Sequence, residues 1–472
     1  MYDFVDDLLK WKDRIAFKFN YNGSIKEITY QTYYNNIFEC LNIIQKKFGN
    51  IKNRHIGIAL GNCYEYLVLI PAIIMGNGVV VPLNILESKN KLKSIVIDAD
   101  IDFIITKDKT DDTFGVKNVV VLSEICSFKN DNRYCLKENR DFDSKALIVY
   151  TSGTTGKAKG VVISYRNLFC RKRNALPRDY YENPQKDDPL NVMLTFPMYH
   201  LAGVECWLSW CGRGFTTFIN GNAGDILFDL KNNNIEFSFV SPAVMKILGK
   251  KIRRGDIREL GSIKGIGSCG APVEKEIIEL FVRNGINYCQ IYGMTETSGE
   301  VTYNGNNEEE LISSVGKAVE GVDLRIIDGE ICVAAECNSK GYYKDNVSTE
   351  ELIVNGYIHT GDLGYINESG YVYIIGRKKN LIILSGGENV SPEELEAQLY
   401  TNMLIKECRI IEHEDRICAE IYSRNEDREE IEGFVLNLNK KLPIFKRINK
   451  IFFREKDFEK TVSGKIRRKK DE

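Results

Sequence analysis

The sequence predicts an α/β fold, with a large N-terminal domain of helix-covered mixed β-sheets followed by a small α+β C-terminal domain. Three observations lead to this prediction. The chain has 472 residues, more than one hydrophobic core usually spans, so two or more domains are expected. From residue 55 onward, short apolar segments alternate with amphipathic ones, as in sheets covered by helices. Hydrophobic residues make up 43% of the chain and charged residues 28%, which is ordinary for a globular protein.

The elements follow in order along the large domain. Aromatic-rich strands are expected at 16–19 and 25–30, and a helical segment then extends to Phe48. Residues 107–140 are more polar and are expected to be irregular. The remaining strands are predicted at 55–60, 79–81, 103–106, 146–150, 161–163, 192–196, 237–240 and 263–267. The remaining helices are predicted at 64–75, 89–99, 201–210 and 243–250, with a further helix that starts near Pro272 and reaches Arg283.

A run of small polar residues separates two of these apolar strands. It consists of Thr151, Ser152, Gly153, Thr154, Thr155, Gly156 and Lys157. Glycines let backbone N–H groups approach an anion, hydroxyls add neutral donors, and the lysine adds a mobile positive charge. The same composition is typical of a solvated linker, but the apolar flanks favour a polyphosphate-binding loop. The Walker spacing is absent, because Ala158 stands where Ser or Thr would follow the lysine.

This loop, YTSGTTGKAKGV, resembles the phosphate-binding loop of the adenylate-forming superfamily. That superfamily comprises acyl- and aryl-CoA synthetases, the adenylation domains of peptide synthetases, and luciferases. Matching strings cover nearly the whole chain in the expected order: FPMYHLAG, GAP, YGMTE, TGD, GRKKN and SGKIRR. The closest likeness is to AMP-dependent acyl-CoA ligases. It implies a ligase that activates a carboxylic acid with Mg-ATP as acyl-AMP and then passes the acyl group to a thiol, with CoA as the first choice.

The resemblance assigns the nucleotide site. The loop from Thr151 to Lys157 would hold the β- and γ-phosphates, Thr295 would face the α-phosphate, and Glu296 would bind Mg²⁺. Asp362 would accept the ribose hydroxyls, with Arg377 reaching the ribose and the phosphate. The adenine would lie against one turn made of the small residues Gly270 and Ala271. Tyr292, which is followed by Gly293, would stack on the adenine ring.

The acyl site is less defined by the sequence. A lone histidine at a strand-to-helix junction is more often structural, but the resemblance places His200 beside the acyl carboxylate. The Asp-containing pattern of amino-acid-activating relatives is absent, which disfavours a simple α-amino acid. Pocket-lining residues, assigned by position, are Val204, Glu205, Trp207, Ser268 and residues 294–299. Trp207 and Cys206 suggest an apolar or aromatic acyl group.

The domain boundary is placed in GRKKN, with an AMP-binding domain at 1–376 and a small mobile domain at 377–472. The resemblance puts the hinge at Lys379 and the thiol path at Gly386 and Gly387. It also makes Lys465 the lysine that bridges the carboxylate and the α-phosphate. From the residues alone, hairpins are expected to turn at 328–329 and 368–370, strands at 408–411, 417–421 and 451–453, and a helix at 428–440. Ser391, Pro392 and Glu394 predict a capping box.

Composition limits the remaining possibilities. A formal charge of −2 gives no basic field for nucleic acid, and no signal peptide or membrane-spanning segment is recognised. Thirteen cysteines without a C-x-x-C pair indicate reduced thiols in the cytoplasm, and four histidines without metal-ligand spacing argue against a zinc site. Two alternatives stay open. One is a stand-alone enzyme that loads an acid onto the phosphopantetheine of a carrier protein. The other, disfavoured by the intact motif residues, is a non-catalytic nucleotide-binding protein.

Overall fold

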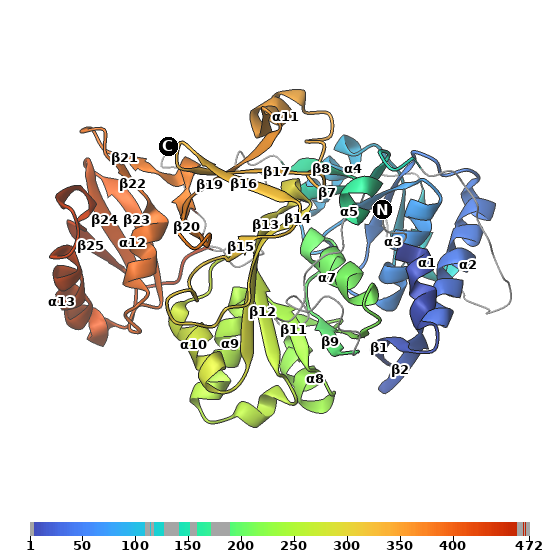
Figure 1. Cartoon of the computed structure of the whole chain (residues 1–472), viewed down its shortest axis with the longest axis horizontal. Coiled ribbons are helices and arrows are strands. Elements are labelled where there is room, and N and C mark those ends of the chain that lie inside the picture. Colours follow the sequence, from blue (N-terminus) through green and yellow to red (C-terminus); the bar gives the residue numbers. More distant parts are fainter. Residues whose placement is uncertain are drawn as a thin grey trace.

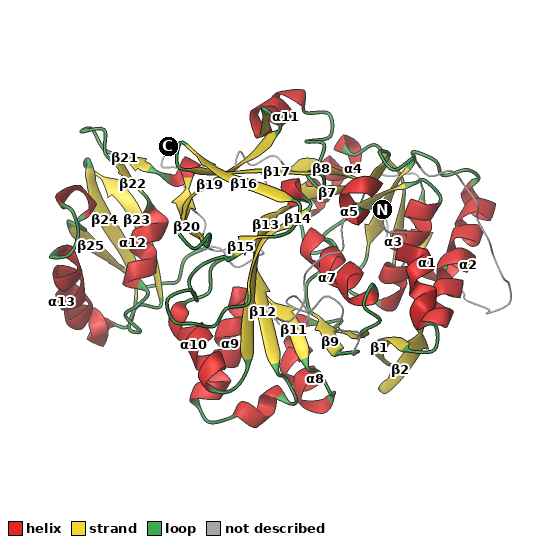
Figure 2. Ribbon diagram, viewed as in Figure 1, coloured by secondary structure: helices red, strands yellow, loops and turns green. Residues whose placement is uncertain are grey.

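The computed structural model describes residues 4–108, 114, 118–126, 141–151, 158–170, 189–459, 466 and 468. Its described strands form two large sheets, a smaller sheet between them and the C-terminal part, and two short sheets in that C-terminal part (Figure 1). Helices cover the two large sheets, as the alternation of segments predicts (Figure 2). The mixed α/β class predicted from the sequence is confirmed.

The first large sheet has the strand order β6-β5-β3-β4-β7-β8. Its strands are β3 (His55–Ala59), β4 (Val79–Pro82), β5 (Ile101–Thr106), β6 (Val119–Val121), β7 (Lys145–Thr151) and β8 (Lys159–Ser164). All neighbours are parallel except β7 and β8, which pair antiparallel across the glycine-rich segment. The expectation that 107–140 is irregular is wrong for its described part, because Val119–Val121 extends the sheet beside β5. Apolar, β-branched side chains favour this short strand despite its polar surroundings.

The helices of this region are α1 (Phe4–Leu8), α2 (Tyr30–Phe48), α3 (Tyr64–Met75), α4 (Lys89–Asp98) and α5 (Tyr165–Phe169). Helix α3 is buried around nearly its whole circumference, which explains why its sequence is apolar on every side. Ser164 caps α5 as predicted, since its side chain accepts the backbone N–H of Asn167 at 3.1 Å. None of the helices in the described ranges is long and apolar enough to cross a bilayer.

The second large sheet has the order β15-β14-β13-β12-β11-β9-β10-β1-β2. Its strands are β1 (Ile15–Tyr21), β2 (Ser24–Thr29), β9 (Asn191–Leu194), β10 (Thr216–Ile219), β11 (Phe237–Val240), β12 (Gly265–Cys269), β13 (Asn287–Met294), β14 (Gly299–Asn304) and β15 (Lys317–Ala318). Its helices are α7 (Leu201–Cys211), α8 (Ile226–Asn232), α9 (Pro242–Arg253) and α10 (Lys275–Arg283). Strands β10, β13, β14 and β15 and helix α8 were not predicted from the sequence. The predicted start of α10 was too early, because Glu274 rather than a residue beside Pro272 is the N-cap.

The sheet between the large sheets and the C-terminal part contains β16 (Val322–Ile327), β17 (Glu330–Ala335), β18 (Ile353–Val354), β19 (Tyr357–Ile366) and β20 (Val372–Arg377), with α11 (Asn346–Leu352) at its edge. Both predicted hairpins are present. Asp328 and Gly329 have φ of 49° and 77°, the left-handed pair that a two-residue hairpin turn requires. The second hairpin pairs β19 with β20.

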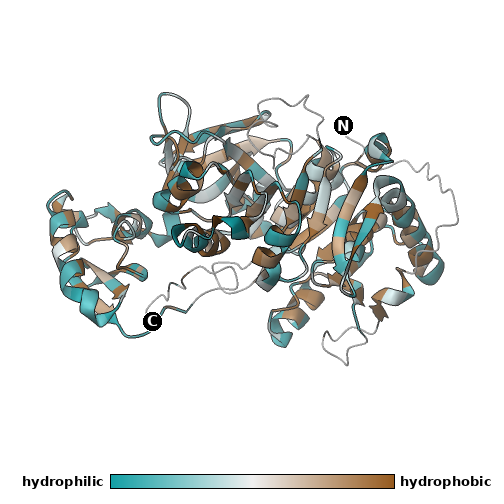
Figure 3. Cartoon of the chain, turned by 90° about the horizontal axis from the view of Figure 1, so that it is seen from below, coloured by the Kyte–Doolittle hydropathy of each residue, from teal (hydrophilic) through white to brown (hydrophobic). Residues whose placement is uncertain are grey.

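The C-terminal part has its own apolar core, formed by buried residues between Leu384 and Ile448. Its elements are β21 (Ile382–Ile383), β22 (Asn389–Val390), α12 (Pro392–Leu399), β23 (Glu407–His413), β24 (Arg416–Tyr422), α13 (Arg428–Asn439) and β25 (Lys450–Arg454). Figure 3 shows hydrophilic stretches on the outer helices of this part. Only half of the predicted capping box forms: Ser391 caps α12, but the Glu394 carboxylate instead pairs with Lys446 at 2.7 Å. The boundary at 376–377 and the hinge stay predictions.

Candidate active site

Two predicted motifs meet at one carboxylate. The Tyr292 hydroxyl, near the end of β13, donates to Oδ2 of Asp362 at 2.8 Å. Nε of Arg377 lies 2.6 Å from Oδ1 of the same residue. Asp362 and Arg377 are direct cross-strand partners in the β19–β20 pair, so the hairpin register itself brings the two charges together. The side chain of Asp362 is only 5% exposed, which strengthens both interactions.

Tyr292 therefore has a structural task besides the predicted stacking on adenine. Burial raises the pKa of its hydroxyl well above the ordinary value, and the charge of Asp362 adds to this. The group stays protonated and keeps donating to the carboxylate. The neighbouring Gly293 is explained by packing, since a Cβ there would come within 1.9 Å of the Gly299 carbonyl oxygen. Adenine stacking remains a prediction.

Glu296 lies in the short 3-10 turn η5 (Thr295–Thr297) that follows β13. Its Oε1 accepts a hydrogen bond from the Tyr342 hydroxyl at 2.8 Å. The ring of Tyr342 also faces the ammonium of Lys159, 4.9 Å from the ring centroid. Because Lys159 opens β8, Tyr342 links the strand after the glycine-rich segment to the predicted metal ligand. Sequence reasoning missed Tyr342, since an isolated tyrosine between β17 and α11 carries no local pattern.

The donor set around Glu296 fits a magnesium ion. The carboxylate of Glu296 and the hydroxyl of Thr295 are adjacent hard-oxygen groups, and Mg²⁺ prefers such groups together with substrate phosphates. Burial raises the pKa of Tyr342, with the charge of Glu296 as the next cause, so this tyrosine remains a neutral donor beside the carboxylate.

His200 stands at the N-terminus of α7, as predicted from the sequence. Its loop is held by Asn62, whose side chain donates to the Phe196 carbonyl and accepts the Met198 N–H, both at 2.9 Å. His200 is exposed to solvent, but protein atoms around the imidazole partly desolvate it and lower its pKa, so the ring is neutral at pH 7. Gly203 permits the close approach of helix and loop, because a Cβ there would lie 2.5 Å from the Pro197 carbonyl oxygen. Asn62 was not found from the sequence.

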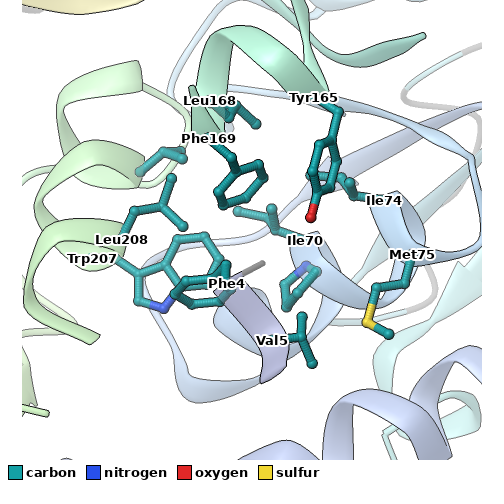
Figure 4. A pocket seen from close by; sticks show the side chains of 12 residues that line it. Phe4, Val5, Ile70, Ile74, Met75, Tyr165, Leu168, Phe169, Trp207 and Leu208 are labelled. Atoms are coloured by element: carbon teal, nitrogen blue, oxygen red, sulfur yellow. The ribbon is translucent and has the colours of Figure 1, made fainter. Parts of the chain in front are cut away.

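Helix α7 presents different residues to its two sides. Glu205 lies against Gly299 on the motif side, where a Cβ on Gly299 would come within 1.9 Å of the carboxyl carbon. Glu205 and Glu300, the residue after Gly299, are both buried, with 8% and 2% of their surface exposed. Val204 and Trp207 instead line an apolar cavity together with residues of α1, α3 and α5 (Figure 4). Trp207 meets the ring of Phe4 there at 5.2 Å, so it no longer supports an aromatic acyl group.

The other predicted site residues are distributed as follows. Thr151 ends β7. Gly270 follows β12 with φ of 82°, and the space where its Cβ would be is open, which leaves room for a flat ring beside Ala271. Lys379 lies in η6 (Lys378–Asn380). Gly386 and Gly387 form the turn between β21 and β22, where the Gly387 N–H donates to the Leu384 carbonyl at 2.8 Å. Ser152, Gly153, Thr154, Thr155, Gly156, Lys157 and Lys465 lie outside the described residues.

A buried acid links the TGD turn to the predicted hinge. Oε1 of Glu330 accepts the Gly361 N–H at 2.8 Å, and Oε2 lies 2.9 Å from Nζ of Lys378 and 3.1 Å from Nδ1 of His359. Burial alone would raise the pKa of Glu330, but these partners outweigh it and lower the pKa. The donor atoms of Glu330, Cys332 and His359 lie within 4.8 Å of one another, a spacing that can hold a metal. Here the Lys378 ammonium supplies the positive charge.

Comparisons with known proteins identify the family of the chain. The family model described as AMP-binding enzyme matches residues 4–343. A 2-succinylbenzoate–CoA ligase from Bacillus cytotoxicus is 27% identical over 382 residues, 78% of this chain and 77% of the relative. A second ligase of that name, from Bacillus cereus, is 29% identical over 376 residues, 76% and 75% of the two chains.

Solved structures share the fold over almost the full length. The o-succinylbenzoate CoA synthetase (MenE) of Bacillus subtilis, in complex with the acyl-adenylate OSB-AMP, gives a TM-score of 0.81 at 21% identity, covering 99% of this chain and 97% of the other. ATP-bound MatB of Rhodopseudomonas palustris gives 0.83 at 22% identity, covering 98% and 96%. At these identities the likeness establishes the fold.

Proposed function

This chain belongs to the AMP-binding enzyme family, and from that premise we propose that it activates a carboxylic acid with ATP and transfers the acyl group to CoA. The observation that carries the proposal is the convergence of Tyr292 and Arg377 on the buried carboxylate of Asp362. Residues far apart in sequence, from different motifs, hold one acceptor for the vicinal hydroxyls of a ribose. A carboxylate suits this task because it can accept hydrogen bonds from both hydroxyls.

In the first step an oxygen of the substrate carboxylate attacks the α-phosphorus of ATP. The new oxygen–phosphorus bond forms as the bond from that phosphorus to the bridging oxygen breaks, and pyrophosphate leaves. A magnesium ion held by Glu296 would neutralise phosphate charge. The neutral imidazole of His200 can donate an N–H to the substrate carboxylate, and Lys465 adds positive charge between the two reacting groups. Positioning and electrostatics thus supply the rate.

In the second step the sulfur of CoA attacks the carbonyl carbon of the acyl-AMP. The carbon–oxygen bond to AMP breaks, AMP leaves, and the thiol proton passes to solvent. Rotation of the small domain, residues 377–472, about Lys379 would withdraw Lys465 and open a thiol path beside Gly386 and Gly387. These roles follow the family resemblance and are part of the proposal.

CoA is proposed over a carrier protein because the relatives at 27% and 29% identity are named as CoA ligases. Their named acid, 2-succinylbenzoate, has two carboxyl groups, whereas this chain has two buried carboxyl groups of its own near the motifs, Glu205 on α7 and Glu300 on β14. Aromatic acids with and without a second carboxyl group are therefore the first substrates to compare. All cysteines among the described residues are free, which supports a reducing cytoplasmic location.

The experiment is acid-dependent release of pyrophosphate from Mg-ATP over a panel of aromatic, fatty and dicarboxylic acids, with and without CoA. Turnover that requires both an acid and CoA supports the proposal and identifies the acid. Pyrophosphate release that an acid triggers and CoA does not increase would favour a carrier protein as the acceptor. No acid-dependent release with any acid would refute acid activation for this panel.

A further inference from the structure

One segment, residues 339–343, holds Glu296 by both its main chain and its side chain. The Ser339 N–H donates to the carbonyl oxygen of Glu296 at 2.9 Å. The Tyr342 hydroxyl donates to Oε1 of the Glu296 carboxylate at 2.8 Å. Glu296 is only 7% exposed, so little water competes for the carboxylate and the hydrogen bond from the tyrosine strongly influences its orientation.

Tyr342 is itself held in place by its neighbours in the fold. Its backbone N–H donates to Oγ1 of Thr349 at 2.9 Å. The segment around it runs antiparallel to β8: Tyr342 is the bridge partner of Val161, and the Val162 N–H donates to the Gly341 carbonyl at 2.9 Å. The main chain that carries the hydroxyl is therefore fixed against a strand of the first large sheet.

The charge of the Glu296 carboxylate is not neutralised by this contact. Among the described residues, the carboxylate accepts the hydrogen bond from the tyrosine and forms no ion pair. The ammonium of Lys159 instead lies 4.9 Å from the Tyr342 ring centroid and donates to Oγ of Ser348 at 2.7 Å. Buried carboxylates are usually paired with a cation or coordinate a metal. A neutral hydroxyl thus orients Glu296 and keeps its full charge available for a metal ion.

We propose that Tyr342 is a positioning residue that holds the Glu296 carboxylate in the orientation that binds magnesium. This inference rests on the proposed function, in which Glu296 holds the magnesium ion that accompanies ATP. A metal-binding carboxylate that is itself hydrogen-bonded keeps its orientation before the metal arrives, and loss of such a partner typically weakens metal binding by about 10- to 100-fold. The hydroxyl is the group that acts here, because the ring contacts Lys159 and not the carboxylate.

Tyr342→Phe tests this role, because it removes the hydroxyl and keeps the ring. ATP binding is measured by isothermal titration calorimetry, once with magnesium in excess and once in EDTA, without acid or CoA. The ratio of the two dissociation constants reports the coupling between metal and nucleotide. Tyr342→Phe is expected to weaken binding of Mg-ATP by about 10-fold or more and to leave the affinity for metal-free ATP within about twofold.

Activity gives a second readout. The magnesium concentration for half-maximal pyrophosphate release should rise by about 10-fold or more in Tyr342→Phe. Saturating magnesium should restore most of kcat, because mass action then compensates for the weaker site. Adding Tyr342→Phe to Glu296→Gln should cause little further loss of Mg-ATP affinity, since the hydroxyl acts through the carboxylate that is already altered.

Tyr343→Phe is the matched control. It removes a hydroxyl from the next residue in the chain, and that hydroxyl also donates to a carboxylate at 2.8 Å, but the acceptor is Asp100. Its ratio of dissociation constants and its magnesium titration are expected to match the wild type. Thermal unfolding of each variant shows whether the protein is intact.

The outcomes separate the role of Tyr342 from the proposed function. An unchanged ratio in a folded Tyr342→Phe protein would overturn the positioning role and leave acid activation intact. Equal losses for metal-free ATP and Mg-ATP, with a lowered melting temperature, would show a structural role instead. A full additional loss in the double variant would show that Tyr342 does not act through Glu296. Absence of acid-dependent pyrophosphate release in the wild type would refute the proposed function, whereas the ratio of dissociation constants still decides the role of Tyr342.

Discussion

Asp362→Asn tests whether the acceptor at the centre of the site binds the nucleotide. The substitution keeps the size of the side chain but removes the charge that Arg377 contacts at 2.6 Å and that Tyr292 contacts at 2.8 Å. A hydrogen bond to a charged group contributes about 1.5–3 kcal/mol, so the loss of such a bond to a ribose hydroxyl should raise KM for ATP by about 10- to 150-fold. The vicinal ribose hydroxyls take no part in bond making or breaking at the α-phosphorus, so kcat should change much less.

The assay is pyrophosphate release at saturating acid with ATP varied, followed by release at saturating ATP with acid varied. KM for the acid should stay within about twofold, because the proposed role of the Asp362 carboxylate is to bind the nucleotide and not the acid. Asp323→Asn is the matched control. Asp323 lies on β16 of the same sheet and also pairs with an arginine, Arg325, at 2.9 Å, but it is exposed. A folded Asp362→Asn protein with an unchanged KM for ATP would refute the assignment.

Three further predictions follow from the same geometry. Glu296→Gln should raise the magnesium concentration needed for half-maximal activity and lower kcat/KM by about 10²-fold; an unchanged magnesium titration would place the metal ligand elsewhere. The lowered pKa of His200 keeps its ring neutral in the folded state, so this histidine should make wild-type stability fall as pH drops below its ordinary value of 6.5. In His200→Asn this contribution to the loss of stability should be absent when the free energy of unfolding is measured with denaturant from pH 7.5 to 5. Identical slopes of the unfolding free energy against pH in the two proteins would contradict the prediction. Gly299→Ala should lower the free energy of unfolding by about 3 kcal/mol or more in chemical denaturation, since φ is +98° and the new Cβ would strike Glu205. The control Gly321→Ala, where φ is +78° and the space for a Cβ is open, should lower it by only about 1–2 kcal/mol. Equal losses at both glycines would show that the Glu205 contact is unimportant.

Much of the fold could be read from residues that are neighbours in sequence. Helix α3 occupies Tyr64–Met75 as predicted, and the Asp328–Gly329 turn and the Ser164 cap are where local chemistry places them. These features depend on side-chain periodicity, positive φ and short side-chain contacts to the backbone, which act over a few residues. Two of the missed elements, β10 and α8, span only four and seven residues, too few for a strong periodic signal. Strands β13 and β14, of eight and six residues, were not predicted either.

The sequence also predicted site residues, chiefly through family resemblance, but it could not say which of them touch. Tertiary packing decided that Tyr292 and Asp362, 70 residues apart, share a hydrogen bond. It likewise decided that Tyr342 reaches Glu296 and that Trp207 turns to Phe4 while Glu205 turns to Gly299. The sequence shows that the helix from Leu201 is rich in large side chains but not which neighbour each side of it meets. Local backbone preferences are encoded by adjacent residues, whereas contacts between distant side chains exist only once sheets and helices have packed into one arrangement.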